Sequence, residues 1–156
     1  MSMKRISHDG ALAALCVSVL WLGILVGVAF LATPAKFLAP SLTLPVALDV
    51  GRWTFAIFNK IEWALCVALL LAVLIGVRSW AAIIAAAIAV VVVAVETLWL
   101  LPLLDRRVGQ IIAGVDPVSS NHHNLYIMLD SIKLLALAIV AGVMVRRLAR
   151  TSQPSE

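Results

Sequence analysis

Four long apolar stretches alternate with shorter polar segments along this chain. The apolar stretches cover residues 11–32, 52–76, 80–101 and 125–145. About 20 apolar residues in an α-helix cross the ~30 Å core of a bilayer, and each stretch is long enough to do so. The pattern therefore predicts an all-α integral membrane protein, a four-helix bundle in a single transmembrane domain over residues 1–150.

Prolines and polar residues mark the expected connections between the helices. The first connection, residues 33–50, contains three prolines, which predict an ordered irregular loop because proline interrupts a helix. Pro102 is expected to end the third helix in the same way, before a polar loop that leads to the fourth. The connection at residues 78–79 is very short. The polar residues 151–156 are predicted to form a disordered tail. The prolines of the first connection are Pro34, Pro40 and Pro45.

Lysine and arginine residues near the helix ends predict the orientation, because loops on the cytoplasmic side carry an excess of positive charge. Six of them lie at the end that holds the two termini, and four lie at the end that holds the two longer loops. This excess places both termini in the cytoplasm and the longer loops outside. The six are Lys4, Arg5, Arg78, Arg146, Arg147 and Arg150, and the four are Lys36, Arg52, Arg106 and Arg107.

The composition strengthens the membrane assignment and restricts the expected partners. Apolar residues make up 63% of the chain and charged residues 13%, against about 45–50% and about 25% in soluble domains. Membrane lipids are thus the expected partners. The net charge is +4, but the basic residues form no stripe with interleaved aromatic residues, which excludes nucleic acid as a predicted partner. Gly23 and Gly27 form a GxxxG pair, which predicts a close helix contact and a possible homo-oligomer.

Five charged residues and one asparagine lie well inside the predicted spans. An ionised side chain at a helix centre costs about 2.5–3.5 kcal/mol on insertion scales, so such residues are candidates for a functional site. With alternating helix directions, all of them fall in the half of the bundle near the longer loops. They are Asn59, Lys60 and Glu62 in the second span, Glu96 in the third, and Asp130 and Lys133 in the fourth.

Helical phase arranges most of these residues in two polar stripes. At about 100° per residue, one sector of the second span contains Arg52, Phe55, Asn59, Glu62 and Cys66, while Lys60 lies outside that sector. A sector of similar width on the fourth span contains His123, Tyr126, Asp130 and Lys133. Burying these stripes against each other and against Glu96 is the least costly arrangement in lipid. The sequence therefore predicts a polar pocket in the outer half of the bundle.

Two interpretations of this pocket are open. Its ionisable groups could form structural ion pairs, with Lys60 or Lys133 bound to Asp130 or Glu62, that fix the register of the helices. Alternatively, the carboxylate without a lysine partner could carry a proton or bind a cation or a metal. The candidate metal ligands are Glu62, Glu96, His122, His123 and Asp130. The spacing forms no HxxH or ExxH motif, and the sequence identifies no cofactor.

Short motifs at these positions resemble those of a known group of proteins. The motifs are ATPAKF at residues 32–37, Gly51 and Arg52 with Phe55, Asn59 and Glu62, LDRR at residues 104–107 after Pro102, and His123, Tyr126, Asp130 and Lys133. In these motifs the chain resembles small four-helix proteins of the bacterial inner membrane and is more distantly similar to the transmembrane protein 205-like domain. The resemblance covers residues 11–147. It implies a four-helix fold in the inner membrane and no assigned reaction.

Three functions are compatible with the pattern. The first is binding or translocation of a small solute, a cation or a lipid-like ligand by the polar pocket. The second is a membrane-embedded enzyme that uses the carboxylate, lysine and histidine groups, with or without a metal, as general acids and bases. The third is an accessory or scaffold subunit in which the ion pairs are structural. The first is our prediction, because the polar groups gather in one half of the bundle.

Overall fold

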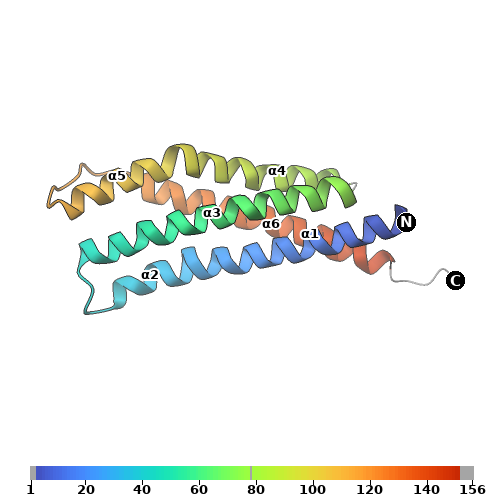
Figure 1. Cartoon of the computed structure of the whole chain (residues 1–156), viewed down its shortest axis with the longest axis horizontal. Coiled ribbons are helices and arrows are strands. Elements are labelled where there is room, and N and C mark those ends of the chain that lie inside the picture. The colour runs from blue at the N-terminus through green and yellow to red at the C-terminus, as the bar shows by residue number, and fades with distance from the viewer. Residues whose placement is uncertain (1–2, 78, 152–156) are drawn as a thin grey trace.

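The computed structural model of this chain describes residues 3–77 and 79–151. Four long helical rods run antiparallel and form one elongated bundle (Figure 1). Each rod is long and apolar enough to span a membrane, as the sequence predicts. The first rod contains α1 (Met3–Leu25), the π-helical η1 (Val26–Ala32), α2 (Thr33–Ala35) and the 3₁₀ turn η2 (Lys36–Leu38); the second is α3 (Leu44–Gly76); the third contains α4 (Trp80–Val95), the π-helical η3 (Glu96–Leu100) and α5 (Leu101–Ile112); the fourth is α6 (His122–Thr151).

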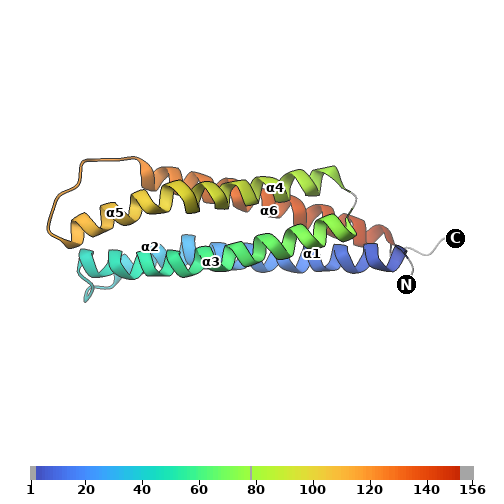
Figure 2. The ribbon, with the colours of Figure 1, turned by 45° about the horizontal axis from the view of Figure 1, so that its top comes forward.

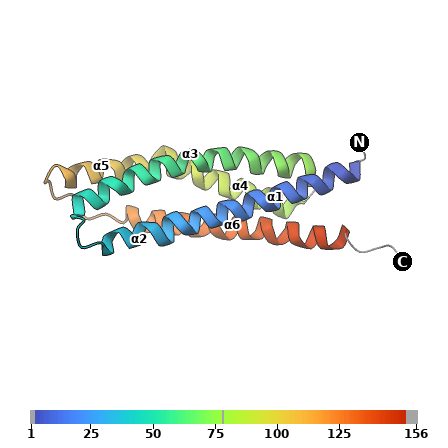
Figure 3. The same ribbon diagram turned by 60° about the horizontal axis from the view of Figure 1, so that its bottom comes forward.

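Each rod packs against two neighbours and faces the remaining rod across the bundle. Helix α1 contacts α3 and α6, and α4 contacts the same two helices. The α5–α6 connection and the start of α3 lie at one end of the bundle, whereas the start of α1 and the end of α6 lie at the other (Figures 2 and 3). Arg78 and residues 152–156, where the short turn and most of the disordered tail are predicted, lie outside the described residues.

The structure contradicts the expected irregular loop over residues 33–50. The first rod stays helical to Leu38 and α3 already begins at Leu44, so only residues 39–43 are irregular. Pro45 lies in the first turn of α3, where the missing N–H of a proline would have no helical partner in any case. The helices at this end are therefore longer than the apolar stretches indicate.

The prolines inside the first and third rods both follow a π-helical turn. Before Pro34, Thr33 donates its N–H to the carbonyl of Val28, five residues back, and its hydroxyl donates to the same carbonyl at 2.8 Å. Before Pro102, the backbone makes the same five-residue step to the carbonyl of Glu96. A π-turn is wider than an α-turn and accommodates the proline ring. The prediction that Pro102 ends the third helix is therefore wrong. The rod continues past this proline as α5.

The half of the bundle near the termini has an apolar core of small residues. Gly10 on α1 faces Gly76 on α3 so closely that a Cβ added to either would lie within 3.0 Å of the other's Cα. Small side chains allow helix backbones to approach in this way. Around this contact the buried residues include Ala11, Ala14, Ala82, Ala86, Ala89, Leu69, Val73, Val140 and Met144.

The predicted contact face of the first rod is directed away from the other helices. A Cβ added to Gly23 or Gly27 would meet no atom within 4 Å. The pair therefore makes no close contact with the described part of the chain. Its role in a homo-oligomer stays a prediction.

Candidate functional site

Four ionisable side chains from three of the rods meet inside the bundle. Nζ of Lys133 on α6 lies 2.7 Å from Glu62 Oε1 on α3, 2.6 Å from Glu96 Oε2 at the start of η3, and 2.9 Å from Asp130 Oδ1 on its own helix. Glu62, Glu96 and Lys133 are 0% exposed and Asp130 is 1% exposed. We refer to these four residues as the buried charge cluster.

Helical spacing brings the members of the cluster together. Asp130 and Lys133 are three residues apart and therefore share one face of α6. Glu62 lies on the same buried face of α3 as Asn59. The indole of Trp21 on α1 donates its N–H to Glu62 Oε1 at 3.1 Å. Every rod of the bundle thus places a side chain at this level.

The ammonium group of Lys133 is completely paired. An ammonium has three N–H donors, and here each short contact joins it to a different carboxylate. The ring of Phe58 adds a cation–π contact, with its centroid 5.9 Å from Nζ. The predicted pairs of Lys133 with Glu62 and Asp130 are confirmed. Since buried charges are tolerated only when paired and hydrogen-bonded, the cluster fixes the register of α3, η3 and α6.

The predicted metal site is assembled only in part. One oxygen from each of the three carboxylates lies within 4.8 Å of the others, as a cation site requires. The ammonium of Lys133, however, contacts all three and already serves as their common cation. His122 and His123 lie in the first turn of α6, and neither joins the carboxylates within the described residues.

The cluster contains more potential negative charge than positive charge. Three carboxylates surround one ammonium, and Glu62 Oε2 has no hydrogen-bond partner within the described residues. An uncompensated charge in such an interior costs several kcal/mol, so protons or a small cation would have to neutralise the excess. The cluster can therefore hold protons in addition to fixing the helix register.

A hydrogen-bonded layer lies next to the cluster on the side of the longer loops. Asn59 Nδ2 donates to Thr97 Oγ1 at 2.9 Å, and Trp63 Nε1 donates to the same oxygen at 3.0 Å. The hydroxyl of Thr97 bonds the carbonyl of Val93 at 2.6 Å. Because Thr97 directly follows Glu96, this layer fastens α3 to the π-turn that carries the glutamate of the cluster.

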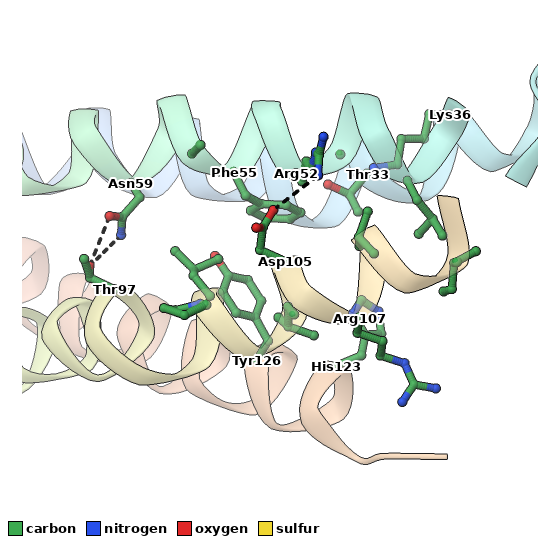
Figure 4. A pocket seen from close by; sticks show the side chains of 18 of the residues that line it. Thr33, Lys36, Arg52, Phe55, Asn59, Thr97, Asp105, Arg107, His123 and Tyr126 are labelled. Atoms are coloured by element: carbon green, nitrogen blue, oxygen red, sulfur yellow. Dashed lines mark hydrogen bonds and ion pairs between the residues drawn. The ribbon is translucent and has the colours of Figure 1, made fainter. Parts of the chain in front are cut away.

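A cavity of about 480 Å³ lies between η2, α3, α5 and the first turns of α6 (Figure 4). Asn59 and Tyr126 line it and precede Glu62 and Asp130 by about one helical turn, so the cavity lies directly beyond the cluster. Its walls are mainly apolar. Ala56 lines the wall and is exposed, so the cavity reaches the surface. The polar lining residues are Thr33, Lys36, Arg52, Asn59, Lys60, Thr97, Asp105, Arg107, His123 and Tyr126.

Two arginines in the cavity wall already have partners. Nε of Arg52 lies 2.8 Å from Asp49 Oδ1, and its Nη1 lies 3.8 Å from Asp105 Oδ1, the ion pair drawn in Figure 4. Nη1 of Arg107 donates to Ser120 Oγ at 2.8 Å and to a backbone carbonyl of the same loop. The first arginine therefore joins α3 to α5, and the second fastens α5 to the loop before α6.

The structure divides the predicted site residues into two groups. One group is the buried charge cluster. The other lines the cavity, where the ring of Tyr126 packs edge-on against Phe55 with centroids 5.2 Å apart. Lys60 is exposed and takes no part in the cluster, in keeping with its position outside the polar stripe. The cluster contains Glu62, Glu96, Asp130 and Lys133; the cavity is lined by Arg52, Asn59, Lys60, His123 and Tyr126.

Further residues belong to the site although the sequence pattern does not mark them as site residues, and four of them show why. Thr97 carried the clearest signal, since it is a polar residue next to Glu96 in an apolar stretch. Trp21 lies deep in the first span, which a purely interfacial tryptophan would not. The sequence pattern places Lys36 in an irregular loop. It places Asp105 beyond the end of the third helix, so neither residue is predicted to face the bundle interior. Only the three-dimensional arrangement brings them to the site.

Comparison of this chain with protein-family models, with curated proteins and with solved structures finds no match. The resemblance to small four-helix proteins of the bacterial inner membrane therefore stays a prediction. The function is argued below from the geometry of the cavity and the cluster.

Proposed function

We propose that this chain is a multi-pass membrane protein that binds a small lipid-like ligand in the cavity at the loop end of the bundle. The observation that carries the proposal is the cavity itself. Its volume of about 480 Å³ and its mainly apolar walls with a few polar groups are typical of small-molecule sites. Ala56 in its wall is exposed, so a ligand can reach the cavity from outside the bundle.

The distribution of polarity supports insertion into a membrane. Large apolar side chains are exposed on all four rods, whereas four ionisable side chains are buried. A protein in water normally shows the reverse arrangement, with apolar side chains inside and lysine and glutamate at the surface. Exposed examples are Leu20, Leu31, Trp53, Leu74, Trp80, Leu98 and Leu135.

Ligand binding explains the structure better than translocation along the bundle. The buried charge cluster occupies the interior just beyond the cavity, and its ammonium is paired on three sides. Past the cluster, the core of the described residues is apolar and closely packed around Gly10 and Gly76. Transporters usually expose a midplane site through broken helices and inverted repeats. We therefore propose a cavity that is open at one end of the bundle.

We further propose the bacterial inner membrane as the location, with both termini in the cytoplasm. The start of α1 and the end of α6 lie at the same end of the bundle (Figure 1), and the excess of lysine and arginine lies there too. In a variant without native cysteines, an impermeant maleimide added to intact cells should label Val118→Cys and leave Thr151→Cys unlabelled. The opposite labelling pattern would place the longer loops in the cytoplasm.

The cavity can be tested by filling it. Ala56→Phe places a phenyl ring in the lining, whereas Ala64→Phe places the same ring on an exposed position of the same helix outside the cavity. In phosphatidylcholine vesicles, a fatty acid that carries a photoactivatable diazirine should label peptides from the cavity walls of the wild-type protein. We expect labelling to fall about tenfold or more in Ala56→Phe and to persist in Ala64→Phe.

The fatty acid and its methyl ester should both be used as probes in this experiment. Equal labelling of Ala56→Phe, Ala64→Phe and wild type by both probes would contradict ligand binding in the cavity. Circular dichroism of the purified variants establishes that both remain helical. Mass spectrometric mapping of the labelled peptides distinguishes the cavity walls from the lipid-facing surface.

A further inference from the structure

One half-buried cation in the cavity wall has no counter-ion among the described residues. Lys36 is half-buried, and its Nζ has neither an ion pair nor a hydrogen bond within the described residues. Its aromatic contact is with the neighbouring Phe37, whose ring centroid lies 5.1 Å from Nζ. A cation–π contact of this kind is worth much less than a charge-assisted hydrogen bond. The ammonium therefore retains its capacity to bind an anion.

A glycine of α3 makes room for this ammonium. A Cβ added to Gly51 would lie within 3.0 Å of Lys36 Nζ, so a larger residue would force the ammonium away. Gly51 also lines the cavity. Figure 4 shows the Lys36 side chain running along the cavity wall beside Thr33 and toward Arg52. The first rod and α3 thus meet where the ammonium is held at the edge of the cavity.

Of the other cations that line the cavity, the two arginines have partners within the described residues and the lysine is exposed. Arg52 lies between the carboxylates of Asp49 and Asp105. Arg107 donates to the loop before α6. Lys60 is exposed on α3. Lys60 also has no ion pair among the described residues, but it is exposed, so Lys36 is the half-buried ammonium of the wall whose charge no described residue balances.

We propose that the ligand of this cavity is an amphiphile with one carboxylate group, which Lys36 binds while the apolar tail lies along Phe55, Leu101, Leu104 and Val108. This inference rests on the proposed ligand-binding function and specifies the chemical class of the ligand. A single ammonium that is half-buried and unpaired balances a single negative charge. A phosphate monoester carries close to two charges at neutral pH, and the carboxylate of Asp105 in the same wall disfavours the second one.

The inference predicts a preference that depends on Lys36. In phosphatidylcholine vesicles, the photoactivatable fatty acid should label the wild-type cavity about tenfold more efficiently than its methyl ester, since hydrogen bonds to charged groups contribute on that scale. Lys36→Gln should abolish this preference by lowering labelling with the acid, while labelling with the ester stays unchanged. Lys36→Arg should retain the preference. Arg106→Gln, which removes an exposed cation of α5 outside the cavity, should also retain it.

Each alternative outcome identifies what is wrong. If the acid and the ester label the wild type equally, or if Lys36→Gln keeps the preference for the acid, the assignment of the head group is overturned while ligand binding stands. If photoactivatable lysophosphatidic acid labels the cavity as well as the fatty acid or better, the restriction to a monoanionic carboxylate is overturned. If Ala56→Phe leaves labelling by every probe unchanged, the proposed function itself is contradicted.

Discussion

Replacing Lys133 with methionine should lower the free energy of unfolding by about 3–5 kcal/mol, because removal of one partner from a buried ion pair leaves the other uncompensated. Methionine keeps most of the length of the side chain and removes its charge. Three carboxylates with oxygens within 4.8 Å of one another would lose their common counter-ion. Their repulsion and their incomplete solvation would then favour separation of α3, η3 and α6.

The loss can be measured by titrating the purified protein from a mild detergent into sodium dodecyl sulfate and following helicity and tryptophan fluorescence. Lys60→Met is the matched control, since it removes a lysine that is exposed on α3. Its effect should stay within about 0.5 kcal/mol, as for other surface substitutions. A loss below about 1 kcal/mol in Lys133→Met would show that the cluster does not hold the helices together.

The same substitution should cost far less once the carboxylates are neutral. In a background of Glu62→Gln, Glu96→Gln and Asp130→Asn, no carboxylate needs a counter-ion, and the ammonium of Lys133 is itself the uncompensated buried charge. Methionine there should cost about 1 kcal/mol or less, because a buried ion network can be exchanged for neutral groups of similar volume without large loss. An undiminished cost in this background would assign the effect to packing. If the single Lys133→Met variant does not fold, the comparison can still be made in this neutral background.

Substitution of Gly10 by alanine should destabilise the bundle by about 1–3 kcal/mol through overpacking. The new Cβ would meet the backbone of Gly76 at less than 3.0 Å, and neither backbone can move aside without separating α1 from α3. Gly76→Ala should have a similar effect for the same reason. The two single changes remove no hydrogen bond and no charge, so any loss reports the close approach of the helices.

The first rod supplies matched controls for this experiment. A Cβ at Gly23 or Gly27 would meet no atom within 4 Å. Alanine at these positions should be neutral or should stabilise the helix by up to about 1 kcal/mol, because alanine is the better helix former. The same titration in sodium dodecyl sulfate provides the comparison. If Gly10→Ala is as stable as Gly23→Ala, the close contact between α1 and α3 is contradicted.

The convergence of the polar groups could be predicted because it depends on helical periodicity. Four helices follow from four apolar stretches, and the phase of Glu62, Asp130 and Lys133 follows from 3.6 residues per turn. The same periodicity correctly separated Lys60 from the polar stripe. What it could not predict was which carboxylates would share the lysine. That depends on the crossing of α3 and α6 and on the π-turn at Glu96.

The helix ends could not be predicted, because a proline normally interrupts a helix and here two prolines lie inside helical rods. In a regular α-helix the ring of Pro34 or Pro102 clashes with the preceding turn. The chain avoids the clash with π-turns, in which N–H groups bond carbonyls five residues back. Nothing in the order of apolar and polar residues marks such a turn. As a result, the sequence pattern predicts loops where the structure has η2 and the first turns of α3 and α5, which together form much of the cavity wall.

The sequence by itself determined the helix count, the membrane-like distribution of apolar residues and the level at which ionisable groups are buried. These features follow from the length and period of the apolar stretches, which are local properties of the chain. Only the tertiary structure decided that Lys133 pairs with three carboxylates and that Lys36 stands unpaired beside a cavity. Both depend on distances between atoms on different helices. Those distances are set by side-chain packing between helices, and the order of apolar and polar residues along the chain does not predict that packing.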